Sequence, residues 1–223
     1  MTSAMLDKAL GPLTGMRLFA CVAELGSESH PYHRSHDLLK GPHSSRNLAD
    51  AVHFLCTVHG CLPGVVDRAV ERTADREAKA WLAAAADVFS DERTYLARLV
   101  MEAGPIPGTP GAASAEAALL SQRHALEMLS GSERNGCALG AAMALVADWS
   151  KIRFVMNAAA MRFGVPVPPW RLGDAEALRT LADNVGASPL VERALLFGAQ
   201  QIMLQHHGLW DLLEARHLAR MAR

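Results

Sequence analysis

The sequence has few aromatic residues and no excess of charge of either sign. Only 5% of its residues are Phe, Trp or Tyr, whereas β-sheets are enriched in aromatic and β-branched side chains. Lys plus Arg (22) nearly equals Asp plus Glu (23), so the chain lacks the positive field that draws proteins to DNA or RNA. We therefore expect a fold without sheets and no nucleic-acid partner.

Long apolar runs and common enzyme motifs are also missing. The longest uncharged helical segment, residues 136–147, ends at Asp148 and is shorter than the about 20 residues that span a bilayer. Neither a phosphate-binding loop, a dinucleotide fingerprint nor a Gly-x-Ser-x-Gly elbow occurs. We expect no membrane association and none of these enzyme classes.

The four cysteines are scattered through a chain of 223 residues. A chain of this length can form a core without disulfides, and scattered thiols are typical of a reducing compartment. The sequence therefore predicts a cytoplasmic protein.

Half of the residues are apolar, and in several segments they recur at helical spacing. Helices are expected at residues 14–25, 45–59, 65–103, 114–130, 132–163, 174–185 and 188–221. The third would be about 60 Å long if unbroken, longer than a compact chain of this size is wide. A break is therefore predicted near Ser90 and Asp91.

The remaining segments are predicted as connections within one domain spanning residues 1–223. Residues 26–45 form an irregular, histidine-rich connection, and residues 104–113 and 164–173 form loops. The predicted fold is all-α, a helical bundle of long antiparallel helices with additional short helices, and a ferritin-like architecture is one form of it.

Histidine is concentrated in the N-terminal third, where six of the ten histidines lie between residues 30 and 59. Three of them form His30-x-x-His33-x-x-His36. Imidazoles with this spacing in a loop or a single helical turn can converge on a transition metal such as zinc. A polar surface loop that is rich in histidine is the alternative interpretation.

A second candidate metal set follows in the next predicted helix. His53, Cys56 and His59 lie roughly along one helix face, with Cys61 close by. Their mixed nitrogen and sulfur donors suit zinc. Cys56 also borders an apolar stripe, and burial in the core explains it equally well, because free cysteine is among the most buried residue types.

An iron site of the ferritin-like kind requires two Glu-x-x-His pairs and two further glutamates on facing helices. The sequence holds one such pair, Glu214-x-x-His217. The likeness to ferritin-like proteins is therefore limited to the bundle architecture, with Glu214 and His217 as candidate ligands.

Polar residues on two apolar helices form the last group of candidates. Asp148 and Arg153 interrupt an apolar helix beside Trp149, and His206 falls on the apolar stripe of the last helix. A charge buried there must be paired. These four residues are predicted to line a pocket, and pairing of Asp148 with Lys151 on the helix surface is the alternative.

Three functions agree with these patterns. The first is a noncatalytic helical-bundle protein that binds a protein partner or a small apolar ligand. The second is a metal-dependent oxidoreductase of ferritin-like helical architecture, and the third is a helical protein with a structural zinc site in its N-terminal third. Alanine-rich helix faces also suit pairing with a second copy of the chain.

Overall fold

The structure is a computed structural model that describes residues 13–222. In this part of the chain nine α-helices and two short 3-10 helices occur without a strand. The prediction of an all-α helical bundle is confirmed. Residues 1–12 and Arg223, which the predicted domain included, lie outside the described residues.

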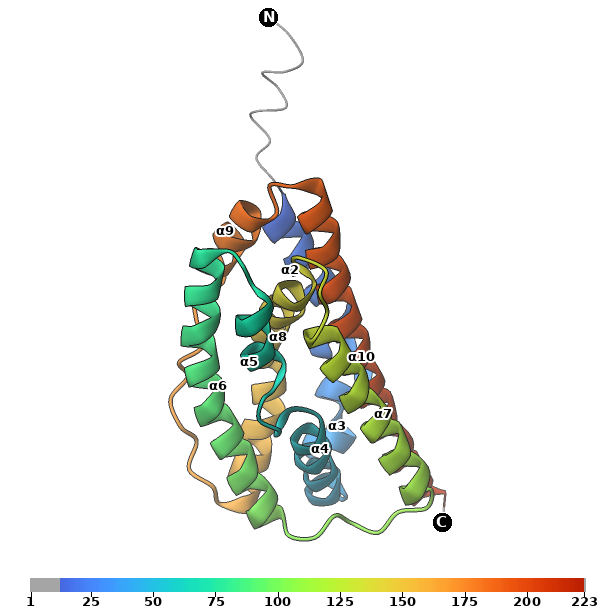
Figure 1. Ribbon diagram of the computed structural model, residues 1–223. Coiled ribbons are helices and arrows are strands. Elements are labelled where there is room, and N and C mark those ends of the chain that lie inside the picture. Colours follow the sequence, from blue (N-terminus) through green and yellow to red (C-terminus); the bar gives the residue numbers. More distant parts are fainter. Residues whose placement is uncertain (1–12, 223) are drawn as a thin grey trace, which may run out of the picture.

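The long helices run roughly along one axis, and shorter helices fill the space between them (Figure 1). In chain order the elements are α2 (Thr14–Leu25), η1 (Ser27–Ser29), η2 (Pro31–Arg34), α3 (His36–Leu39), α4 (Ser44–His59), α5 (Val65–Arg72), α6 (Arg76–Ala103), α7 (Ala112–Ser130), α8 (Cys137–Phe163), α9 (Ala175–Val185) and α10 (Pro189–Met221). Among them, no helix combines the length and the apolar character needed to cross a membrane.

The break predicted near Ser90 and Asp91 is wrong. The chain instead breaks between α5 and α6, where the Asp75 carboxylate accepts a hydrogen bond from the Ala78 N–H at 2.8 Å and caps α6. From there α6 continues without interruption for 28 residues. At 1.5 Å per residue this is about 42 Å, so one bundle accommodates the helix.

The segment between α2 and α4 is more ordered than predicted. It consists of η1, η2 and α3, and two side chains cap these turns. Nδ1 of His30 accepts a hydrogen bond from the Tyr32 N–H, and the Ser35 hydroxyl accepts one from the Leu38 N–H. Because Tyr32, His33 and Leu38 are buried, the segment is part of the core and not an irregular connection. Residues 104–111 connect α6 to α7 and residues 164–174 connect α8 to α9, close to the two loops expected at 104–113 and 164–173.

Helix α8 lies at the centre of the bundle, with residues 137–146 all buried. Its tightest contact is with α10. A Cβ atom at Gly140 would lie 1.9 Å from the backbone oxygen of Leu195, and one at Gly198 would lie 2.0 Å from that of Cys137. Only glycine, which has no Cβ, permits so close an approach of two helices at these positions.

Helices α8 and α10 run in the same direction. The neighbouring pairs along them are Gly136 with Val191, Gly140 with Leu195, and Asp148 with His206. The antiparallel arrangement that was expected of the long helices does not hold for this central pair. The reason is that residues 164–188, including α9, return the chain to the end of the bundle at which α8 began (Figure 1).

Candidate functional site

A network of polar groups lies inside the bundle around Asp148 on α8, which is 1% exposed. One carboxylate oxygen, Oδ1, accepts a hydrogen bond from the Ser27 N–H at 3.0 Å. The other, Oδ2, accepts from the Ser27 hydroxyl at 2.5 Å and from Nδ1 of His206 at 2.7 Å. Three donors from η1 and α10 thus satisfy a carboxylate that burial alone would destabilise.

These contacts set the charge of Asp148. Burial by itself would raise the pKa of this carboxyl, but the hydrogen bonds from His206 and Ser27 outweigh it, and the pKa lies below its usual value of 3.8. Asp148 is therefore ionised at neutral pH and holds the proton of His206 on Nδ1. The second ring nitrogen of His206, Nε2, is buried with no partner among the described residues.

His59, the last residue of α4, stands beside this network. The centroid of its ring lies 5.1 Å from that of His206 and 5.5 Å from that of Trp149, and it meets both rings edge to face. Burial, and to a smaller extent the nearby His206, hold the pKa of His59 well below 6.5. The His59 ring is thus neutral at neutral pH, and its Nε2 has no partner within residues 13–222.

His59 forms part of the wall of a cavity between α5, α7 and the end of α4. The volume of this cavity is about 30 Å³, enough for about two or three water molecules. Pockets that enclose organic ligands measure roughly 300 Å³ or more. The cavity beside His59 is therefore of the size of a small polar group.

Three arginines from three helices line the cavity: Arg68 of α5, Arg93 of α6 and Arg123 of α7. Nη1 and Nη2 of Arg93 donate to the Asp67 carboxylate at 2.9 and 3.4 Å, and Nε of Arg123 donates to Glu127 at 3.1 Å. Arg68 forms no ion pair with the described residues, and its Nε is buried without a partner there. The wall thus carries one uncompensated positive charge.

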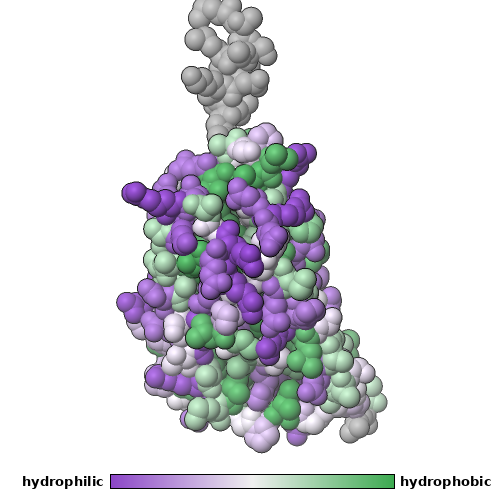
Figure 2. Space-filling model, in the orientation of Figure 1, coloured by the Kyte–Doolittle hydropathy of each residue, from purple (hydrophilic) through white to green (hydrophobic). Residues whose placement is uncertain are grey.

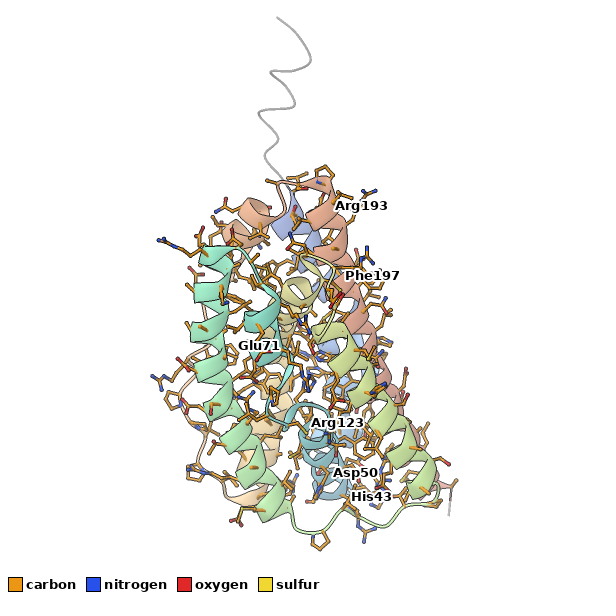
Figure 3. The ribbon with its side chains drawn as sticks, viewed as in Figure 1. His43, Asp50, Glu71, Arg123, Arg193 and Phe197 are labelled. Atoms are coloured by element: carbon orange, nitrogen blue, oxygen red, sulfur yellow. The ribbon has the colours of Figure 1, made fainter. Side chains whose placement is uncertain are left out.

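The N-terminus of α5 adds to this positive character, because Gly64, Val65 and Val66 also line the cavity. Asp67 accepts a hydrogen bond from the Gly64 N–H at 2.8 Å and closes the first turn of the helix. The positive end of a helix dipole attracts anions. Hydrophilic side chains gather in the middle of this face of the molecule (Figure 2), and Arg123 of α7 lies there (Figure 3).

The four predicted pocket residues are buried, but none of them lines the cavity. Nε1 of Trp149 donates to Glu92 on α6 at 3.0 Å, and Glu92 forms a buried ion pair with Arg153. Asp148 does not pair with Lys151, whose ammonium group lies 2.6 Å from Glu28. Two of the four, Trp149 and His206, contact the His59 ring. The other two, Asp148 and Arg153, are linked to them, Asp148 directly and Arg153 through Glu92.

The structure separates the three histidines of the His30-x-x-His33-x-x-His36 motif. His36 is exposed. His33 is buried, and its Nε2 donates to the backbone oxygen of Lys151 at 2.9 Å. Burial also lowers the pKa of His33 below 6.5. The motif attaches η2 to α8 and α10 and does not bring three imidazoles to one point.

In the described part of the chain, one group of three ligand-type side chains comes together, formed by His30, His207 and Asp211 within 4.8 Å. Nε2 of His30 lies 3.1 Å from Asp211 Oδ1, and its Nδ1 accepts the Tyr32 N–H. A neutral imidazole that binds a metal through Nε2 carries its proton on Nδ1, which would break the contact with Tyr32. These contacts indicate that His30 caps η2 and attaches it to α10 through Asp211. They argue against a metal ion bound by Nε2 of His30.

The side chains of His53, Cys56 and His59 also lie in different surroundings and do not form a common metal site. Nε2 of His53 donates to the backbone oxygen of Gly104 at 2.8 Å and ties α4 to the end of α6. Cys56 packs against the core, and burial raises the pKa of its thiol. Cys61, in contrast, shares the cavity wall with His59.

The Glu214-x-x-His217 pair does not form a ligand group either, because both ring nitrogens of His217 face protein groups. Nδ1 of His217 lies 3.2 Å from the side-chain amide of Asn47, and Nε2 lies 3.4 Å from Asp37 Oδ2. Glu214 takes no part in these contacts. His217 alone attaches α10 to α3 and α4.

Sequence reasoning identified His59 but missed the three arginines beside it. Arg68, Arg93 and Arg123 are 25 and 30 residues apart in the chain and share no motif. Arginine is common on helix surfaces, so nothing local marks these three residues. The packing of α5, α6 and α7 is what brings them to one cavity.

Comparison with known proteins gives a family without an assigned activity. No curated protein matches the chain, and no solved structure matches it. The model of a family described as "Family of unknown function (DUF6975)" matches residues 22–221. This range includes every residue of the cavity wall and of the network around Asp148. The chain therefore belongs to the DUF6975 family.

Proposed function

We propose that the protein is a noncatalytic helical binding protein that holds an oxyanion group of its ligand, a phosphate or a carboxylate, in the cavity beside His59. One observation carries the proposal. Arg68 has no ion-pair partner among the described residues, its Nε is buried and unpartnered, and it lines a cavity at which α5 begins. A buried donor without a partner is costly unless a ligand satisfies it.

The size of the cavity supports a small anionic group. About 30 Å³ corresponds to roughly two or three water molecules, which the oxygens of one phosphate or carboxylate group can replace. Arginine binds both groups through short, charge-assisted hydrogen bonds. The ion pairs of Arg93 with Asp67 and of Arg123 with Glu127 hold these two guanidinium groups in place around the site. An apolar ligand is less well supported, because the wall is charged.

The arrangement supports binding without a reaction. His206 and Ser27, the two side chains bonded to Asp148, are absent from the cavity wall. The only histidine on that wall, His59, is held neutral by burial. A neutral imidazole can give one hydrogen bond to an anion without repelling the arginines.

Titration calorimetry of the full chain at pH 7.5 and constant ionic strength tests the proposal, with inorganic phosphate and acetate as the two probes. We expect saturable binding of at least one anion. Arg68→Gln is expected to weaken it about tenfold or more, since a hydrogen bond to a charged group contributes about 1.5–3 kcal/mol. Arg72→Gln is the matched control, because Arg72 is exposed on the same helix.

The two anions distinguish the ligand classes. Binding of phosphate alone identifies a phosphorylated ligand, and binding of acetate alone identifies a carboxylate. If neither anion binds, or if Arg68→Gln binds as tightly as Arg72→Gln, the site is not in this cavity. Circular dichroism spectra and melting temperatures of both variants show whether the fold is kept.

The two metal-dependent functions stay proposals supported by individual residues. The group of His30, His207 and Asp211 would supply metal ligands for a ferritin-like oxidoreductase or for a bound zinc ion. The hydrogen bond from the Tyr32 N–H to Nδ1 of His30 is unfavourable for either metal. Elemental analysis of the purified protein separates them: stoichiometric iron supports the oxidoreductase, and stoichiometric zinc supports a structural site. Cytoplasmic location and the lack of a nucleic-acid partner also stay proposals, supported by the scattered cysteines and the balanced charge. Binding of a protein partner stays a proposal supported by the exposed apolar side chains.

A further inference from the structure

Two of the four tryptophans are accessible to solvent, and both of them line the same pocket. Trp149 and Trp210 are buried in the core, whereas Trp170 is 45% exposed and Trp81 is half-buried. Trp81 belongs to α6, and Trp170 lies in the segment between α8 and α9. Only 5% of the residues of this chain are aromatic. The meeting of both accessible indole rings at one pocket therefore points to a use for them outside the core.

The pocket lies between α2, α6, α8, α9 and the segment of residues 164–174, at the end of the bundle where α9 lies beside α2 and α6 (Figure 1). Phe19 of α2, Val146 of α8 and Leu178 of α9 complete its apolar wall. The volume of the pocket is about 210 Å³. A cavity of about 150 Å³ can hold a benzene molecule. The pocket between the two tryptophans therefore has room for one aromatic ring or for two fused rings.

The segment between α8 and α9 holds Trp170 in place at the pocket. Pro168 and Pro169 directly precede this tryptophan and restrict the backbone there. The buried Arg153 guanidinium donates a hydrogen bond to the backbone oxygen of Pro168, and Leu172 on the other side of Trp170 is buried. A wall that is already ordered in the free protein loses little entropy when a ligand binds.

The charges around the pocket favour a ligand without charge. Asp174 is the only charged residue among the described residues of the wall, and its carboxylate repels an anion. The guanidinium groups of Arg153 and Arg179 lie 5.7 and 4.8 Å from the ring centroids of Trp170 and Phe19, so these two rings already face a cation. Aromatic rings pack favourably against each other in stacked or edge-to-face geometry. A neutral aromatic ring therefore fits the wall in both charge and shape.

We propose that this pocket is a second binding site of the protein, which holds a small neutral aromatic molecule of one or two rings against Trp81 and Trp170. The site shares no wall residue with the cavity beside His59. The proposal therefore does not depend on anion binding, and the two sites can be tested independently of each other.

Titration calorimetry of the full chain at pH 7.5 tests the site with three probes that share one ring system: neutral indole, anionic indole-3-acetate and cationic tryptamine. We expect indole to bind with a Kd below about 1 mM and both charged probes to bind more weakly. Trp170→Ala is expected to weaken indole binding about tenfold or more, because it removes one wall of the pocket. Arg68→Gln, in the other cavity, is expected to leave indole binding unchanged.

Phe197→Ala is the matched control for Trp170→Ala. Phe197 is an aromatic residue of similar exposure, 41%, and it also faces an arginine, since the Arg134 guanidinium lies 5.2 Å from its ring centroid. It lies on α10, away from the pocket between the tryptophans. Its replacement is therefore expected to leave the Kd for indole unchanged.

Nuclear magnetic resonance locates the bound indole. Each of the four tryptophans gives one Nε1–H signal in the spectrum of the ¹⁵N-labelled protein, and single Trp→Phe variants assign these signals. Indole is expected to shift the signals of Trp81 and Trp170 and to leave those of the buried Trp149 and Trp210 nearly unchanged. The proposal is overturned if the wild type binds no indole up to about 10 mM, if Trp170→Ala binds indole as tightly as Phe197→Ala, if the shifts are confined to the buried pair, or if a charged probe binds more tightly than indole.

Discussion

Acidification from pH 7.5 to 5.5 is expected to destabilise the fold through His59. In the folded protein, burial holds the pKa of His59 well below 6.5, whereas in the unfolded chain the imidazole titrates near its usual value. Between these two pKa values the unfolded chain binds a proton that the folded protein does not bind. The free energy of unfolding therefore falls as the pH falls through this window.

The size of this change in the free energy of unfolding follows from the binding of one proton. A proton bound by the unfolded chain alone changes the free energy of unfolding by about 1.4 kcal/mol per pH unit, so His59 accounts for a loss of about 1.4 kcal/mol at pH 5.5. His33, whose pKa burial also lowers, adds a contribution of the same sign. Asp148 acts outside this window, because its lowered pKa removes stability only when the pH falls below about its usual value of 3.8.

Urea unfolding followed by circular dichroism at pH 7.5, 6.5 and 5.5 measures this dependence. His59→Phe keeps an aromatic ring against Trp149 and His206 but cannot bind a proton, so about 1.4 kcal/mol of the pH dependence should disappear. His36→Gln, at an exposed histidine, should keep the full dependence. If His59→Phe loses as much stability between pH 7.5 and 5.5 as the wild type, the buried neutral state of His59 is refuted.

Three substitutions test the packing and the network by urea or thermal unfolding. Gly140→Ala should destabilise by about 3 kcal/mol, because its Cβ would lie 1.9 Å from the Leu195 oxygen and forces α8 and α10 apart; Gly173→Ala, with nothing within 4 Å, should be nearly neutral. Asp148→Asn should destabilise by about 3 kcal/mol, because its amide offers one acceptor oxygen where three donors from Ser27 and His206 converge, and a loss below about 1 kcal/mol contradicts the network. Asp75→Ala should remove about 1 kcal/mol by deleting the cap of α6, and an unchanged midpoint contradicts that role.

Helix positions were predictable where the signal is local. The helices expected at 174–185 and 188–221 correspond to α9 and α10, and the apolar residues after Gly136 lie in a buried helix, as predicted. Asp174 caps α9, and Pro189 is the first residue of α10. The break before α6 lies at the capping residue Asp75, a local signal, whereas the length of the helical pattern carries no information on where the break falls. The uninterrupted helix also places Glu92 opposite Trp149, a tertiary contact that no local pattern encodes.

The candidate site was predictable only in part. The sequence placed His206 and Asp148 on apolar helices and therefore inside the protein, and both are buried. That they meet each other, and that Ser27 joins them, depends on which turn of α10 faces which turn of α8. The cavity beside His59 was not predictable, since it exists only through the packing of helices that are far apart in the chain.

The close contact of α8 and α10 has a consequence for the buried network. Gly140 and Asp148 are eight residues apart on α8, and Gly198 and His206 are eight residues apart on α10, which is about 12 Å along each helix. Since the helices run in parallel, the close contact at the two glycines fixes the position of α10 along α8. It therefore also fixes which residues face each other about two turns further on, where Asp148 meets His206. Insertion of one residue between Gly198 and His206 would rotate the imidazole by about 100° about the helix axis. Asp148 would then lose its hydrogen bond from His206 although no side chain of the network had been altered.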